Sequence, residues 1–411
     1  MADHRSAHSP IKLLHVSDVH FGTETYGRLD AASGLNTRLL DFAACFDQAI
    51  DCAIAEGVDL AIFTGDAYRS RDPNPTHQRE FARRIHRLVA ADIPVFLLVG
   101  NHDLPLHLGR AHSMDIFETL AVPNVFVARK PGLQIIPTRR GPVQVAAMPW
   151  VIRSVLLAKD EFKNHTLDEI NVVIAERIAR IVQDQAEQLD PALPAVLCAH
   201  LSVMGAVYGS ERSIMLGQDV AVPKSALAHP AFDYIALGHV HKHQVLHTRP
   251  LMLYPGSIER VDFGEEHDEK GFVLVTLAKG EAEYRFVPVK ARRFLSIEIR
   301  AGGDDPLQQV LNTIARHDVA EAIVRVLIHT TAEQEGRIPY SEVRKALKGA
   351  SYVAAISKKV QREERHRLGG QLAEAISPED ALQLYLRAKQ VPPERQKTLL
   401  QYAGQLIRAA P

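Results

Sequence analysis

The sequence predicts an α/β fold in which a mostly parallel sheet is covered by helices, followed by a smaller α+β region and a helical tail. Two observations predict the sheet: short apolar runs alternate with amphipathic segments, and polar clusters follow several of the apolar runs. Such alternation is typical of parallel strands with helices on their faces. A change of composition near residue 290 separates the smaller region, and 411 residues suffice for two or three domains of about 100–200 residues.

The first strands and helices follow from hydrophobic periodicity. Residues 11–16 form an apolar run of the β type. Residues 36–56 carry apolar side chains on one stripe at helical spacing, and Gly57 is placed to end that helix. The pattern continues with a strand, a helix and a strand expected at 58–63, 76–91 and 95–99.

The pattern then recurs with more β character. One long helix is expected at 167–188, and Lys279-Gly280 is a plausible hairpin turn between two late strands. The strands are expected at 142–148, 195–199, 232–237, 251–254, 271–277 and 283–289.

The last third of the chain is expected to form two smaller units. Strands at 294–299 and 322–328 alternate with helices at 306–315 and 340–347. Gly369-Gly370 is a candidate linker, and two helical segments, 378–389 and 393–409, follow it. We therefore divide the chain into a large domain at 1–289, a small α+β domain at 290–360 and a helix-loop-helix tail at 371–411.

Composition and charge describe an ordinary globular protein. The formal net charge of -1 gives no global signal for nucleic acid, although a local basic face would suffice for binding. The three cysteines have neither disulfide nor zinc-finger spacing, which suggests a reducing compartment. The first ten residues are polar, and no apolar run approaches about 18 residues, so we expect a cytoplasmic protein without a membrane span.

Five polar clusters lie just past the ends of expected strands, where open α/β sheets place ligands. They are Asp18-Val-His20, Gly65-Asp66, Gly100-Asn101-His102-Asp103, His200, and Gly238-His239-Val-His241. Carboxylate, imidazole and amide oxygen suit Mn²⁺, Fe²⁺ or Zn²⁺. If the backbone is still extended, Asp-x-His and His-x-His each send both side chains to one side. Each cluster alone is a weak signal, but the five together in this order predict a metal centre.

This order of clusters resembles the signature of the calcineurin-like metallophosphoesterases over about the first 280 residues. Two further segments resemble the DNA double-strand-break nucleases of the SbcD type. The first is His15-Val-Ser-Asp-Val-His-Phe-Gly22, and the second combines Tyr254-Pro-Gly-Ser-Ile-Glu-Arg260 with Phe263-Gly-Glu265 and Glu269-Lys-Gly-Phe272. The resemblance implies a β-sandwich flanked by helices, a small capping domain for the 290–360 unit, and a tail that binds an ATPase partner.

The resemblance also assigns roles within the clusters. It implies one metal ion held by Asp18, His20, Asp66 and His241, and a second held by Asp66, Asn101, His200 and His239. Asp66 would then bridge two divalent ions, for which we expect Mn²⁺. The resemblance makes His102 an acid that stabilises or protonates the leaving oxygen. Asp103 would orient His102, with a loop or helix cap as the competing interpretation.

The resemblance implies a Mn²⁺-dependent DNA nuclease, with 3′-5′ double-strand exonuclease and single-strand or hairpin endonuclease activity. It would act at DNA ends with an SbcC-type ATPase held by the C-terminal helices, and as a homodimer through the nuclease domain. Arg69 stands where relatives often carry a histidine linked to exonuclease activity, and it could bind phosphate or simply be a surface charge. Two alternatives remain: a phosphoesterase for a small phosphodiester, nucleotide or phosphoprotein, and a non-catalytic subunit that binds DNA ends.

Two residues near the clusters are expected to be structural. His15 lies inside the first strand, and Trp150 is the only tryptophan of the chain. We expect His15 to be a buried structural residue and Trp150 to belong to the core or to an interface, in preference to a base-stacking role.

Overall fold

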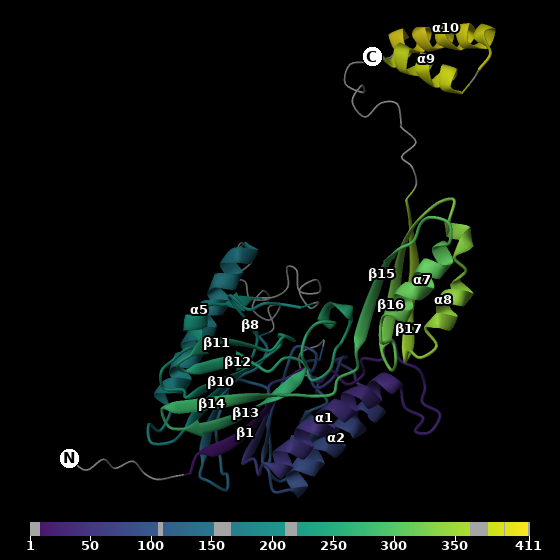
Figure 1. Ribbon diagram of the computed structural model, residues 1–411. Coiled ribbons are helices and arrows are strands. Elements are labelled where there is room, and N and C mark those ends of the chain that lie inside the picture. Colours follow the sequence, from purple (N-terminus) through teal and green to yellow (C-terminus); the bar gives the residue numbers. More distant parts are fainter. Residues whose placement is uncertain are drawn as a thin grey trace.

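The computed structural model describes residues 9–105, 110–151, 166–209, 220–361, 377–389 and 391–409. In this part of the chain two six-stranded sheets form the larger body, and a three-stranded sheet forms a smaller one (Figure 1). The predicted α/β class is confirmed, with two large mixed sheets flanked by helices and a helical tail.

The first large sheet has the strand order β14-β13-β1-β2-β3-β4. Its central strands are parallel, whereas β13 and β14 run antiparallel at one edge. Helices α1 and α2 pack on its outer face, and Asn36 and Asn74 cap their N-termini. The elements are β1 (Ile11–Val16), α1 (Thr37–Ala55), β2 (Leu60–Phe63), α2 (Pro75–Ala90), β3 (Val95–Leu98), α3 (Asp115–Thr119), β4 (Val125–Ala128), β13 (Gly271–Ala278) and β14 (Glu281–Pro288).

The second large sheet has the order β11-β12-β10-β7-β6-β5, again parallel at its centre and antiparallel at both edges. Helix α5 covers its outer face, and a capping box of Thr166 and Glu169 begins that helix. The elements are β5 (Gly132–Ile136), β6 (Val143–Met148), α5 (Leu167–Glu187), β7 (Ala195–His200), β10 (Tyr234–Gly238), β11 (Gln244–Thr248) and β12 (Leu251–Tyr254), with the short β8 (Ser202–Val203), β9 (Ala221–Val222), η2 (Lys224–Ala226) and η3 (Phe263–Glu265) in the connections.

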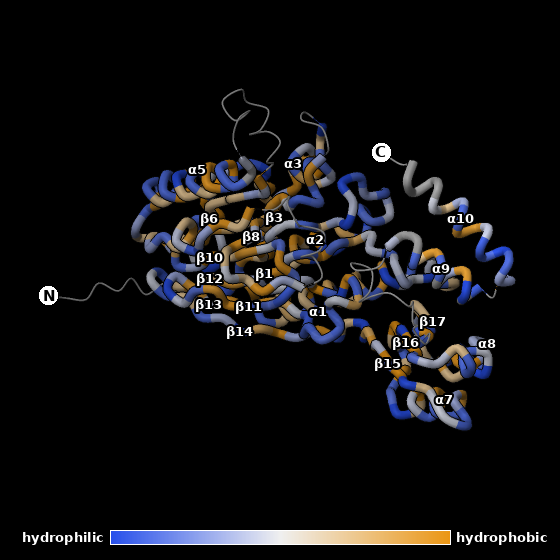
Figure 2. Tube along the Cα trace, turned by 90° about the horizontal axis from the view of Figure 1, so that it is seen from above, coloured by the Kyte–Doolittle hydropathy of each residue, from blue (hydrophilic) through white to orange (hydrophobic). Residues whose placement is uncertain are grey.

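The inner faces of the two sheets pack against each other to form a β-sandwich. Leu13, Ile62 and Phe96 of the first sheet belong to the same buried cluster as Val196 and Leu253 of the second. Figure 2 shows hydrophobic residues concentrated along the strands between α5 and α1. Since the central strands are buried on both faces, their sequences are short, largely apolar runs, and these runs located them in the sequence.

The elements between residues 115 and 136 were absent from the sequence prediction, as were the short strands β8 and β9. Strands β4 and β5 and the short helix α3 lie between residues 115 and 136, where no strand or helix was expected. Most residues of β4 and β5 are only partly buried, and α3 has five residues. Edge strands and short helices of this kind carry little hydrophobic periodicity, so the sequence does not distinguish them from loops.

The smaller body has a hydrophobic core of its own. Helices α7 (Pro306–Ala315) and α8 (Tyr340–Ala346) pack on one face of the parallel sheet β15-β16-β17. Figure 1 shows both helices on the side of this sheet that is turned away from the larger body. The elements of this sheet are β15 (Phe294–Arg300), β16 (Ile323–Thr331) and β17 (Tyr352–Gln361), with η4 (Glu335–Arg337) before α8. The domain boundaries at residues 289–290 and 360 remain predictions.

The tail contains α9 (Pro378–Ala388) and α10 (Pro393–Ala409), which pack against each other. Leu386 is buried in this hairpin, whereas Tyr385, Leu399 and Tyr402 are exposed. The predicted Gly369-Gly370 linker lies outside the described residues. Within the described ranges, no helix combines the length and the apolar character needed to cross a membrane.

A buried polar link joins the two sheets beneath the polar clusters. The Oγ1 of Thr64 donates to the carbonyl of Leu237, so it accepts from Nε2 of His15, 3.0 Å away. The hydroxyl of Tyr234 then donates to Nδ1 of His15 at 2.6 Å. Burial lowers the pKa of His15 to about 3, so the ring is neutral and structural, as the sequence suggested.

This link predicts a pH-dependent contribution to stability. The imidazole of His15 takes up a proton near its ordinary pKa only in the unfolded chain, so the free energy of unfolding falls as the pH drops from about 6.5 towards 3. Glutamine does not titrate, so His15→Gln should reduce this loss by about 1.4 kcal/mol per pH unit. Urea unfolding of both chains between about pH 7 and pH 5 measures the two slopes, and equal slopes would contradict a neutral His15.

Candidate metal centre

The predicted clusters all come together at the C-terminal ends of the central strands. Asp18 and His20 follow β1, and Asp66 follows β2. Asn101 follows β3, His200 ends β7, and His239 and His241 follow β10. The two sheets therefore contribute to one site, and the candidate carboxylates and imidazoles are buried: Asp18, His20, Asp66, His200, His239 and His241.

The local backbone differs from the one assumed in the sequence argument. Asp18, His20 and Asp66 have φ values of 52°, 49° and 56°, in the left-handed region that side chains other than glycine rarely adopt. The condition of an extended backbone is therefore not met at Asp18 and His20. The turns are held by backbone hydrogen bonds: Asp18 N–H donates to Gly65 O at 3.1 Å, and His20 N–H to Asp66 O at 3.0 Å. Strained residues held in this way are typical of functional sites.

The ligand atoms form two adjacent groups. In the first, which we call the His241 group, atoms of Asp18, His20 and His241 lie within 4.8 Å of one another. In the second, the His200 group, the same holds for Asp66, His200 and His239.

Asp66 lies between the two groups. Its Oδ2 is 3.4 Å from Nε2 of His200 and 3.8 Å from Nε2 of His20. The Oδ1 of Asn101 is 2.9 Å from Nε2 of His200 and 3.0 Å from Nδ1 of His239, so Asn101 joins the His200 group. Asp66 thus lies between the two groups, and the assignment of one metal ion to each group remains a prediction from the resemblance.

Two observations test whether these residues fit metal ions. Oδ1 of Asp18 and Nδ1 of His20 are buried and have no hydrogen-bond partner among the described residues, and a carboxylate left in that state is costly without a cation. A Cβ added to Gly100 would lie 2.2 Å from Oδ1 of Asp66, and one added to Gly65 would lie 2.3 Å from Nδ1 of His200. These glycines are thus required for close approach of the ligand-bearing turns.

The donor set fits two divalent cations, since hard carboxylate oxygens and borderline imidazoles converge in each group. When bound, two such cations neutralise phosphate charge and acidify an attacking water. Burial alone would lower the pKa of His200, but the Asp66 carboxylate beside it raises that pKa to about 9. Metal ions therefore compete with a proton at this ligand, because an imidazole binds metal only through an unprotonated nitrogen.

His102 lies at the edge of the centre. Its backbone N–H donates to Oδ1 of Asp66 at 2.8 Å, and its Nδ1–H donates to the carbonyl of Arg69 at 2.9 Å. Its ring centroid is 5.0 Å from that of His20, in an edge-on arrangement. His102 also groups with His20 and Asp66 in metal-ligand geometry, so the structure leaves it available either as a proton donor or as a ligand.

Asp103 does not orient His102 in the structure. Its carboxylate accepts from the backbone N–H groups of Asp66 (2.8 Å), Ala67 (3.0 Å) and Gly100 (3.0 Å). The carbonyl of Arg69 occupies the orienting position that the resemblance gave to Asp103. The competing interpretation, a loop cap, is the one these contacts favour, since Asp103 fixes the two turns that carry Asp66 and Asn101.

Sequence reasoning missed three residues that contact the candidate ligands. The carbonyl of Thr64 accepts from Nδ1 of His200 at 2.6 Å, and Oε1 of Glu265 lies 2.7 Å from Nδ1 of His241. The ring of Trp150 lies 4.7 Å from that of His239, centroid to centroid. A carbonyl contact leaves no trace in side-chain identity, but Glu265 stands in a segment that the resemblance had already singled out.

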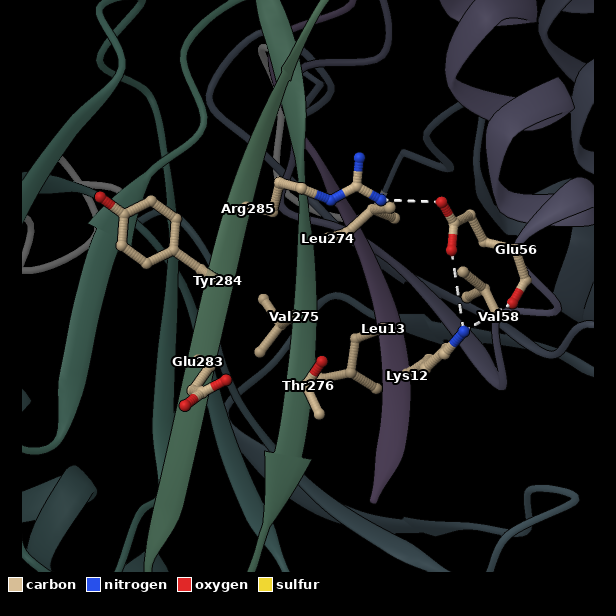
Figure 3. Close-up of a pocket in the computed structure, with 10 residues that line it drawn as sticks. All are labelled: Lys12, Leu13, Glu56, Val58, Leu274, Val275, Thr276, Glu283, Tyr284 and Arg285. Atoms are coloured by element: carbon tan, nitrogen blue, oxygen red, sulfur yellow. Dashed lines mark hydrogen bonds and ion pairs between the residues drawn. The ribbon is translucent and has the colours of Figure 1, made fainter. Parts of the chain in front are cut away.

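A surface hollow lies apart from this centre. It is lined by Lys12, Glu56 and Arg285 among others, around the beginning of β1 (Figure 3). The metal clusters follow the opposite end of β1. Glu56 accepts from Arg285 at 2.8 Å and lies 3.7 Å from Lys12, and Glu283 adds a second carboxylate, so two acidic and two basic side chains line this hollow.

Fold and site together define a metal-dependent phosphoesterase. Residues 11–243 match the family model of calcineurin-like phosphoesterases, and the chain belongs to that family. It is also similar to a solved dimetal phosphatase from Danio rerio (LOC 393393), at 10% identity and a TM-score of 0.38 over 67% of this chain and 98% of that one. Another similar solved structure is the protein TT1561 of Thermus thermophilus, at 13% identity and a TM-score of 0.39 over 68% of this chain and 99% of that one.

Substitution of His102, the candidate acid, and of His241, a candidate metal ligand, should have different effects on activity and metal content. His102→Ala should reduce phosphodiester hydrolysis by at least about 100-fold while both metal ions stay bound, as removal of a general acid does. His241→Ala should lose one of the two ions, because it removes a ligand. The metal content of the dialysed proteins shows whether each variant keeps two ions. Because Trp150 lies beside His239, quenching of its fluorescence by Mn²⁺ provides a second measurement of metal binding. Normal hydrolysis by His102→Ala would refute the acid role.

Proposed function

We propose that the protein is a Mn²⁺-dependent DNA nuclease that processes double-strand breaks, as a 3′-5′ double-strand exonuclease and a single-strand or hairpin endonuclease. It acts with an SbcC-type ATPase. The phosphoesterase chemistry comes from the family, whereas the DNA substrate and the partner are our inference. The observation that carries the inference is a sheet face of the small domain that bears basic side chains, adjoins the metal centre and is left exposed by the described residues.

The small domain contacts the turn that carries Glu265. Glu265 bonds to the candidate ligand His241, and the next residue, Glu266, accepts from both N–H and hydroxyl of Ser296 in β15. Phe263 of the same turn packs edge-on against Phe294, with 4.9 Å between ring centroids. Adjacent residues of this turn therefore contact the metal centre and the first strand of the small domain: Glu265 contacts His241, and Glu266 contacts Ser296.

The open face of the small sheet begins at Ser296. Strand alternation and register put Arg300, Arg325 and Lys359 on this face, together with the acidic Glu298. These four side chains are exposed, because α7 and α8 cover only the opposite face. A row of cations that starts beside the hydrolytic site suits the phosphates of a polymer better than a small substrate.

The tail supports the partner proposal. Tyr385, Leu399 and Tyr402 are exposed on a two-helix hairpin, although large apolar side chains of this kind are normally buried. Such a surface suits docking on a partner helix. Dimerisation through the nuclease domain remains a prediction from the resemblance.

A nuclease assay tests the proposal. Purified full-length protein should shorten linear duplex DNA and open hairpin ends in the presence of Mn²⁺, and an SbcC-type ATPase with ATP should increase the rate. Arg325→Ala/Lys359→Ala should weaken cleavage of duplex DNA and lower its salt dependence, since two phosphate contacts are removed, while hydrolysis of bis-(p-nitrophenyl) phosphate stays unchanged. Product lengths and end chemistry report the polarity.

Two other outcomes favour the alternatives. Rapid turnover of a small phosphodiester or nucleotide, with no DNA cleavage under either condition, would assign the enzyme a small substrate. DNA binding without any bound Mn²⁺ would assign a non-catalytic subunit that binds DNA ends.

Arg69 should contribute to phosphate binding. Within the described part of the chain no hydrogen bond or ion pair holds its half-buried guanidinium. Burial lowers the pKa of His102, Asp66 raises it, and the charge of Arg69 lowers it again, so the guanidinium lies close enough to affect the centre electrostatically. Arg69→Ala should raise the KM for DNA about tenfold, as expected for one lost charged hydrogen bond. Arg83→Ala is the matched control, since Arg83 is an exposed arginine of α2 paired with Glu80, and an equal KM in both variants would contradict the role.

A further inference from the structure

A buried ion pair lies directly behind His241. Glu265 and Lys270 are both fully buried, and Oε2 of Glu265 is 2.8 Å from Nζ of Lys270. Both belong to the 254–272 segment, which the sequence singled out but to which no chemistry has so far been assigned. We propose that Glu265 and Lys270 are positioning residues, which fix the imidazole and the backbone of His241 so that its Nε2 is presented to a divalent cation.

The imidazole of His241 is held by Glu265. Nδ1 of His241 lies 2.7 Å from Oε1 of Glu265, and a carboxylate accepts the proton that Nδ1 carries. The other nitrogen, Nε2, then carries no proton, and it lies 3.0 Å from Nε2 of His20. Two imidazole nitrogens converge here beside Oδ1 of Asp18, which accepts no hydrogen bond from the described residues and lies 3.8 Å from Nε2 of His20. This is the kind of arrangement that a cation requires.

The backbone of the same histidine is held by Lys270. Nζ of Lys270 donates to the carbonyl of His241 at 3.0 Å and to Oγ of Ser257 at 2.9 Å. The N–H of Ser257 donates to the same carbonyl at 3.0 Å. One ion pair therefore fixes both ends of the ligand residue.

The energetic cost of this pair argues for a role beyond stability. Desolvation of two charges offsets most of their attraction, and apolar pairs of similar volume are often as stable or more stable. The remaining acceptor capacity of Glu265 is satisfied by the N–H of Val261 at 3.0 Å.

The arrangement distinguishes His241 from two other candidate ligands. His200 donates from Nδ1 to a neutral carbonyl, and Nδ1 of His20 has no hydrogen-bond partner among the described residues. A carboxylate makes its imidazole partner a stronger base and hence a better metal ligand. We therefore expect Glu265 to affect the cation of the His241 group and to leave that of the His200 group largely unchanged.

The same turn provides a matched control. Glu266 is adjacent to Glu265, but its carboxylate accepts from Ser296 N–H at 2.8 Å and from the Ser296 hydroxyl, not from the metal centre. Glu266→Gln therefore makes the same chemical change in the same turn without touching His241.

The experiment counts bound Mn²⁺. Metal-free full-length protein is titrated with Mn²⁺, free ion is measured by electron paramagnetic resonance, and Trp150 fluorescence is followed in parallel. The unaltered chain and Glu266→Gln should bind two ions with equal affinity profiles. Glu265→Gln should weaken one of the two ions by about 10–100-fold. Because Glu265→Gln leaves Lys270 buried without its partner, Glu265→Gln/Lys270→Met is measured as well.

The double variant separates positioning from simple stabilisation. Removal of both charges should return the thermal unfolding temperature towards that of the unaltered chain, while one Mn²⁺ stays weakened about 10–100-fold. Full affinity for both ions in the double variant would overturn the proposal, as would equal weakening of both ions or an unchanged Glu265→Gln. The inference rests on the metal centre of the proposed function. If the protein binds two Mn²⁺ ions but does not cleave DNA, the nuclease proposal is refuted and the positioning role of Glu265 and Lys270 is not.

Discussion

The Asp66 carboxylate lies between both groups of candidate ligands, and the geometry of the centre depends on how this residue is held. Asp103 accepts from its backbone N–H, and its own carbonyl accepts from His20. Its Oδ1 accepts from the backbone of His102, which leaves Oδ2 to face His20 and His200. Because a carboxylate fixed on every side cannot turn away, the surrounding ligands meet at one place, and Gly100 provides the space for it.

The centre is complete only when the two sheets have closed on each other. The first sheet supplies Asp18, His20, Asp66 and Asn101, and the second supplies His200, His239 and His241. Ligands from both halves of a sandwich are not preformed in an unfolded chain, so bound metal stabilises the folded state by mass action. The buried link through His15 and Tyr234 joins the same two sheets without metal, which keeps them in register beneath the site.

Much of the fold follows from the sequence, because central strands buried on both faces are continuous apolar runs. Strands β4 and β5 could not be predicted, since partial burial at the sheet edges removes that pattern. The seven candidate ligands were found because their clusters follow apolar runs, and the structure brings all of them together. The spacing of residues in the sequence does not reveal the left-handed backbone at Asp18 and His20. It also does not reveal which carbonyl or carboxylate faces each imidazole, so the contacts of Asp103 and Glu265 could be identified only in the structure.

The adjacency of Glu265 and Glu266 also limits how the small domain can be exchanged between related proteins. The small domain has its own hydrophobic core, and it would otherwise be an exchangeable module. Its first strand, however, is hydrogen-bonded through Ser296 to Glu266. Glu266 directly follows Glu265, which contacts the candidate ligand His241. A chimera that joins a foreign module to this phosphoesterase body therefore needs a backbone N–H at the position of Ser296, and a hydroxyl side chain there keeps the second contact to Glu266.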